Sequence, residues 1–70
     1  MNKKLVLART NADFTQKELA SKVGIGERTY QAYEAEGRVP NVSTAILIAS
    51  VLGVDVKDIF TVKSYHEKTG

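Results

Sequence analysis

The amino-acid sequence predicts an all-α fold, a compact bundle of five helices. Three observations lead to this prediction. Thr15, followed three residues later by Glu18, is a capping box, in which each residue's side chain satisfies the other's backbone N–H at a helix start. Apolar residues recur at helical spacing between positions 16 and 23 and again between positions 42 and 52. Glycines stand just past both stretches, where a helix commonly ends.

Length and composition fit one small domain. The chain has 70 residues, a single proline and no internal repeat, so a second core is not expected. It is 43% hydrophobic and 26% charged, as in ordinary soluble globular proteins, and should fold unaided. Cysteine is absent, which excludes disulfides and thiolate zinc sites, and we expect neither a metal nor a cofactor. The net charge of +2 gives only a weak hint of an anionic partner.

The sequence contains no candidate for a membrane span or a secretion signal. The longest apolar run, 45–49, is far shorter than the roughly 20 residues that a spanning helix needs. The apolar residues 5–8 stop at Arg9, short of the about 7 to 15 apolar residues of a signal peptide. We therefore expect a cytoplasmic protein without membrane contact.

The first three helices are predicted from caps, stripes and glycines. Helix one should run from about Lys3 to about Asn11, with an exit turn at 11–13. Helix two should start near Gln16 and end at Gly24, because glycine adopts the left-handed backbone that other residues adopt only at a cost. Gly26 should open helix three, which ends by residue 37. The residues expected to face inward in these helices are Leu5, Ala8, Ala12, Leu19, Ala20, Val23, Ile25, Tyr30 and Tyr33.

Two further helices follow a loop at 38–40, where proline is incompatible with helix. Asn41 should cap helix four, from Val42 to Leu52, and Gly53 should end it. Its inward stripe is predicted to be Val42, Ala45, Ile46, Ala49 and Leu52. Asp55 should cap a short last helix that runs through Phe60. Residues 61–70 are polar and should fray.

The segments 15–20 and 24–25, followed by Arg28, Thr29, Tyr30, Tyr33 and Glu34, resemble the lambda-repressor and Cro (XRE-type) family of helix-turn-helix DNA-binding domains. Leu5, Arg9 and Asn11 resemble the first helix of that family, and 40–42, 44–46, 48–49, 52–54 and 59–60 resemble its fourth and fifth. The resemblance implies a DNA-binding domain at 1–60 and leaves 61–70 as a tail, frayed or in dimer contact. It implies sequence-specific binding of double-stranded DNA and transcriptional regulation as a repressor.

Helix three carries the candidate base-reading residues. Its tyrosines should seat it on the core, which leaves Glu27, Arg28, Thr29, Gln31 and Ala32 outside. Arg28 can offer two donors to guanine and Gln31 can pair with adenine. Thr29 and Ala32 can touch a thymine methyl group. Glu27 can accept a hydrogen bond from cytosine, or it simply points away.

A second set of residues should orient the domain on DNA. Gln16 lies in the first turn of helix two, where free backbone N–H groups can hold a phosphate. The resemblance implies that Gln16 contacts the DNA backbone and buttresses the recognition helix. Lys17, Arg38 and Asn41 are further phosphate candidates. The resemblance also implies an internal ion pair between Arg9 and Glu34.

Several residues depart from the family pattern. Val6, Leu7 and Leu47 stand where related sequences commonly carry polar residues. We hypothesise that Leu47, Val51, Val54 and Phe60, with the tail, form a homodimer surface, and that Val6 and Leu7 form a second patch; alternatively, the tail covers these residues. The segment 35–37 is also unusual, because the family often closes the recognition helix with Asn-Gly.

The favoured reading is a regulator that places helix three in the major groove of a two-fold operator, as a homodimer at least on DNA. The alternative is a protein-interaction module, such as an antitoxin or coregulator domain, that docks through Leu47 and Val51. Catalysis is not expected, because no His, Cys or Ser constellation supplies an acid, a base and a nucleophile, and the lone His66 should be a solvated tail residue. No small-molecule ligand is expected.

Overall fold

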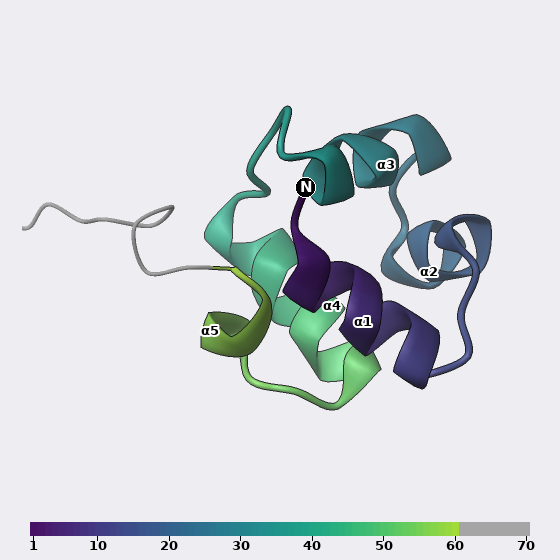
Figure 1. Ribbon diagram of the computed structural model, residues 1–70. Coiled ribbons are helices and arrows are strands. Elements are labelled where there is room, and N and C mark those ends of the chain that lie inside the picture. The colour runs from purple at the N-terminus through teal and green to yellow at the C-terminus, as the bar shows by residue number, and fades with distance from the viewer. Residues whose placement is uncertain (61–70) are drawn as a thin grey trace, which may run out of the picture.

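The structure, a computed structural model, describes residues 1–60 and forms five helices there (Figure 1). The helices are α1 (Lys3–Asn11), α2 (Gln16–Val23), α3 (Glu27–Ala35), α4 (Val42–Leu52) and α5 (Val56–Ile59). The predicted five-helix all-α bundle is confirmed. The expected tail contacts and His66 lie outside the described residues.

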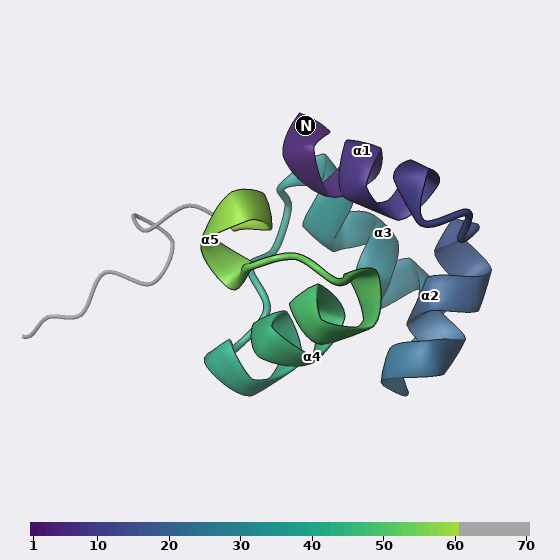
Figure 2. The ribbon, with the colours of Figure 1, turned by 90° about the horizontal axis from the view of Figure 1, so that it is seen from below.

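The helices enclose one core. α2 packs against α3 and α4, while α5 contacts both α1 and α4. Figure 2 shows α1 and α4 on opposite sides of the bundle, with α2 at one end and α5 at the other. The largest fully buried side chains come from four helices and are Tyr30, Leu5, Leu19 and Ile48. None of the helices within residues 1–60 is long and apolar enough to cross a membrane.

The predicted caps fix the helix-turn-helix segment. Thr15 Oγ1 accepts a hydrogen bond from the Glu18 N–H (3.0 Å), and Glu18 Oε1 accepts one from the Thr15 N–H (2.9 Å). Gly24 then ends α2 with a φ of +83°. Because this left-handed conformation favours glycine, the turn between α2 and α3 follows directly from the sequence.

The expected inward stripe of α4 was partly wrong. Val42 and Ile46 are 56% and 53% exposed, and the buried residues of α4 are Ala45, Ile48, Ala49 and Leu52. α4 contains no charged residue, so apolar side chains lie on most of its circumference. Two stripes with the same helical spacing were therefore available, and packing against α2 and α5 selects the one that contains Ile48.

Asn2 joins three helices, which the sequence did not indicate. Its Oδ1 accepts from the Leu5 N–H (3.0 Å) and caps α1, while its Nδ2 donates to the Ile59 carbonyl (2.6 Å). Its backbone N–H donates to the Glu34 carbonyl of α3 (2.7 Å). One residue therefore connects the start of α1 with α3 and α5.

Glu36 ends α3 in the left-handed region, with a φ of +66°. For a residue with a Cβ this conformation costs roughly 1–2 kcal/mol. Glu36→Gly is expected to raise the free energy of unfolding by about 0.5–1 kcal/mol, less than the full cost because glycine loses more backbone entropy on folding. The contact that this variant removes, from the Met1 ammonium to Glu36 Oε1 (2.9 Å), joins two exposed groups and stabilises little.

Urea unfolding followed by circular dichroism measures this effect. The matched control is Ala35→Gly, which places glycine one residue earlier, inside the helix. That change is expected to lower stability by about 0.5–1 kcal/mol. A loss of stability in both variants would contradict the assignment of strain to Glu36.

Candidate nucleic-acid interface

Two tyrosines seat α3 on the core. Tyr30 is fully buried and Tyr33 nearly so, and their rings meet edge to face with centroids 6.3 Å apart and an interplanar angle of 77°. Ile25, in the turn before α3, is half-buried and packs against the same core. The inward face of α3 is therefore the predicted one, and the opposite face lies at the surface.

The five candidate base-reading residues differ in exposure. Glu27, Arg28 and Gln31 are exposed, whereas Thr29 and Ala32 are half-buried. Gln31 Nε2 donates to Glu27 Oε2 (3.3 Å), one helical turn earlier. The surface of α3 thus presents one cation, one anion and one amide, and the anion and the amide are in contact.

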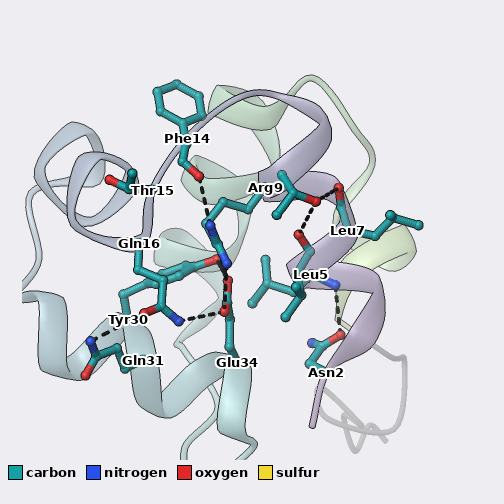
Figure 3. A network of polar contacts seen from close by, with 12 residues as sticks. Asn2, Leu5, Leu7, Arg9, Phe14, Thr15, Gln16, Tyr30, Gln31 and Glu34 are labelled. Carbon is teal, nitrogen blue, oxygen red and sulfur yellow. Dashed lines mark hydrogen bonds and ion pairs between the residues drawn. The ribbon is translucent and has the colours of Figure 1, made fainter.

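Glu34, also on α3, is the centre of a buried polar network (Figure 3). Arg9 of α1 contacts both carboxylate oxygens: its Nε lies 2.6 Å from Oε2 and its Nη2 lies 3.4 Å from Oε1. Gln16 Nε2 donates to Oε1 (2.8 Å) and the Tyr30 hydroxyl donates to Oε2 (2.5 Å). The structure thus contains the ion pair between α1 and α3 that the resemblance implied, together with two donors that the sequence did not reveal.

The network keeps Glu34 ionised although its side chain is almost fully enclosed. Burial on its own would raise the pKa of Glu34, but hydrogen bonds from Arg9, Tyr30 and Gln16 outweigh it and hold the pKa below its usual value. Burial, with Glu34 as hydrogen-bond partner, raises the pKa of Tyr30, so its hydroxyl stays protonated as a donor. Arg9 Nη1 also donates to the Phe14 carbonyl (2.8 Å), which extends the network to the loop before α2.

Stability should therefore fall in acid through Glu34. The pKa of Glu34 is lower in the folded than in the unfolded chain. Ionised Glu34 therefore makes its full contribution to the free energy of unfolding above the pKa of the unfolded chain, about 4.3, and this contribution is lost as the pH falls through the pKa of the folded chain. The stability difference between the parent and Glu34→Gln should narrow as the pH drops below about 4. Urea titrations from pH 7 to pH 2.5 test this, and a difference independent of pH would refute it.

The four residues expected to orient the domain differ in exposure. Gln16 is the first residue of α2 and is half-buried, while Lys17, Arg38 and Asn41 are exposed. Asn41 caps α4, as predicted, by accepting from the Thr44 N–H (2.8 Å).

A basic cluster that the sequence did not reveal adjoins Arg38. Lys4, Lys57 and Arg38 line the same cavity of about 260 Å³ between α1, α5 and the loop before α4, and one acidic residue, Glu36, lines it with them. Sequence reasoning missed this cluster because its cations come from three distant segments. Among residues 1–60 there is no group of His, Cys, Asp and Glu side chains arranged to hold a metal.

The dimer surface expected from the sequence needs correction. Phe60 is only 5% exposed and belongs to the core, and Val51 and Val54 are half-buried against it. Of the four residues expected to form this surface, Leu47 is the one that is exposed. Of the second expected patch, Leu7 is exposed while Val6 is half-buried.

A different set of apolar residues is exposed on and before α4. We define the α4 apolar face as Val42, Ile46 and Leu47 of α4 with Val39 of the preceding loop, all large and exposed. It includes the two residues that were expected to point inward.

Comparisons with known proteins place this geometry in context. A family model described as helix-turn-helix matches residues 5–59. An HTH-type transcriptional regulator of Methanocaldococcus jannaschii, described as uncharacterised, is 37% identical over 60 residues, which are 86% of this chain and 91% of the relative.

Two other relatives are longer than this chain. The transcriptional repressor RstR of the cryptic phage CTXphi in Vibrio cholerae is 33% identical over 51 residues, which are 73% of this chain and 46% of RstR. The HTH-type transcriptional regulator ImmR of Bacillus subtilis is 35% identical over 54 residues, which are 77% of this chain and 42% of ImmR. The chain therefore spans a little under half the length of these two relatives.

Proposed function

The chain belongs to the helix-turn-helix family of DNA-binding transcription regulators, and from this premise we propose that it binds duplex DNA in a sequence-specific manner and represses transcription. α3 enters the major groove. The observation that carries this proposal is the two-sided character of α3: the buried tyrosines fix it to the core, while Glu27, Arg28 and Gln31 face outward. A recognition helix needs this combination of a rigid seat and polar side chains that reach base edges.

Phosphate contacts position the domain. Gln16 starts α2, where backbone N–H groups without a helical partner can donate to a phosphate. Lys17, Arg38 and Asn41 add exposed polar groups, and Lys4 and Lys57 add charge beside Arg38. These contacts fix the register and carry no sequence information.

The α4 apolar face supports a homodimer on a two-fold operator. A second copy is the occupant that fits, because α4 contains no charged residue and a symmetric contact would bring no like charges together. Ile46→Glu, at a residue that is 53% exposed, should keep the protein monomeric in concentration-dependent sedimentation, whereas Leu7→Glu on α1 should sediment like the parent. Parent and Ile46→Glu proteins with the same sedimentation would exclude this face.

Selection from randomised duplex DNA, followed by sequencing, tests the main proposal. The parent should enrich a motif with two-fold symmetry. Arg28→Ala should lose about 1–3 kcal/mol of discrimination, or roughly 5- to 150-fold, at one base position. Arg38→Ala, the matched control, should weaken binding to all sequences alike and reduce the salt dependence by about one counterion.

The outcome also decides between the two classes of function. Weak binding that vanishes as the salt concentration rises, with no enriched motif, would indicate nonspecific attraction to phosphates. In that case the exposed α4 apolar face would favour a protein-interaction module instead.

A further inference from the structure

A run of hydrogen bonds with a single direction leads from the buried Glu34 to the exposed Gln31. We propose that Glu34, acting through Gln16, sets the orientation of the Gln31 amide, so that Gln31 presents its carbonyl oxygen to DNA and selects adenine or cytosine. This inference rests on the proposed function. It makes Glu34 and Gln16 positioning residues for base selection, beyond their structural roles.

The first step is the contact between Glu34 and Gln16. An ionised carboxylate can only accept hydrogen bonds, so the Gln16 atom that lies 2.8 Å from Glu34 Oε1 must be the amide nitrogen. The reversed amide would place the Gln16 oxygen against Glu34 Oε1, two acceptors, at a residue that is only 4% exposed. That arrangement leaves buried polar groups unpaired and is strongly disfavoured. Glu34 therefore fixes the orientation of the Gln16 amide.

The second step carries this orientation to the surface. With its nitrogen on Glu34, Gln16 turns its Oε1 toward α3, where it accepts from Gln31 Nε2 (3.4 Å). Glu27 Oε2 is a second acceptor for the same nitrogen (3.3 Å). Both contacts are long, but both favour the same orientation. Figure 3 shows the Gln31 nitrogen toward Gln16 and its oxygen on the other side.

The third step concerns the bases. In the major groove adenine presents the N6 amino group and cytosine the N4 amino group, and both are donors. Guanine and thymine present oxygens, which cannot pair with a carbonyl oxygen. With its nitrogen held by two acceptors, Gln31 should prefer the two bases that carry an amino group. Without this constraint the Gln31 amide could rotate and pair with any of the four bases, through either its oxygen or its nitrogen.

The test is the base preference at the position that Gln31 reads, identified as the position whose preference Gln31→Ala abolishes. The parent should favour adenine and cytosine over guanine and thymine by about 5- to 10-fold, as expected for one hydrogen bond. Gln16→Met keeps the ion pair of Glu34 and the length of the side chain but removes both amide contacts. It should reduce the preference to less than about twofold at this position alone.

Lys17→Met is the matched control. It makes the same replacement at the neighbouring residue, which is exposed and contacts neither Glu34 nor Gln31 through any hydrogen bond identified in residues 1–60. It should lower affinity at all sequences and leave the base preference unchanged. Circular dichroism should show that both variants fold. Glu34→Gln is not the primary variant, because it also weakens the ion pair that supports the fold.

The outcomes separate this inference from the proposed function. A parent motif that prefers guanine or thymine at this position, an unchanged preference in Gln16→Met, or the absence of any position that depends on Gln31 would overturn the inference and leave DNA binding intact. No enriched motif for the parent would overturn both.

Discussion

Arg9→Met is expected to lower the free energy of unfolding by about 3–5 kcal/mol. Methionine keeps much of the length of the arginine side chain but leaves the Glu34 carboxylate buried without its ion partner. At roughly 0.05–0.15 kcal/mol per residue, a 70-residue chain has a total stability of roughly 3.5–10 kcal/mol, so this loss removes a large part of it. Urea unfolding followed by circular dichroism at pH 7 gives the value.

A double variant provides the control for this prediction. In Arg9→Met/Glu34→Gln the buried group is neutral. Its amide oxygen can accept from Gln16 in place of Oε1, and its amide nitrogen can donate to the Tyr30 hydroxyl oxygen in place of Oε2. The uncompensated charge is removed, so the double variant should be more stable than Arg9→Met alone. Equal losses in the single and double variants would mean that the destabilisation comes from lost packing around Arg9 rather than from the unpaired carboxylate.

Leu5→Ala should cost about 2–5 kcal/mol, because the Leu5 side chain is fully buried and its truncation leaves a cavity in a small core. Leu7→Ala, two residues along the same helix, makes the same chemical change at a side chain that is 61% exposed. It should change stability by no more than about 0.5 kcal/mol. Thermal and urea unfolding of both variants measure the difference. Similar values for the two would show that α1 packs in another orientation.

Local signals were sufficient to predict the first four helices, whereas α5 ends at Ile59 rather than Phe60 and Asp55 begins it without the side-chain hydrogen bond expected of a cap. The caps at Thr15 and Asn41 and the endings at Gly24 and Gly53 depend on residues no more than four positions apart. The stripes of α2 and α3 were also predicted correctly, because polar residues leave each helix only one apolar face. For these elements the amino-acid pattern permits a single arrangement.

The remaining features depend on contacts between distant segments. α4 is apolar on most of its circumference, so its inward face was decided by its neighbours. The sequence therefore assigned Ile46 to the core and Val51 to the dimer surface, whereas Ile46 is exposed and Val51 packs against the core. The hydrogen bond from Asn2 to Ile59 and the convergence of Lys4 with Lys57 join residues more than 50 positions apart. In the candidate site, the ion pair was implied by family resemblance, while the direction of the Gln16 contacts required atomic geometry.

The bonds of Asn2 also determine where the domain can be joined to other segments. Because its side chain donates to the Ile59 carbonyl, the beginning of α1 lies beside the last described residues, and Met1 lies at the end of α3, against Glu36 (Figure 1). A polypeptide joined to Met1 would therefore start at the end of α3, one helix length from the turn between α2 and α3, and close to the end of α5. Segments added at the two ends would start close together, so an extension at one end can pack directly against an extension at the other.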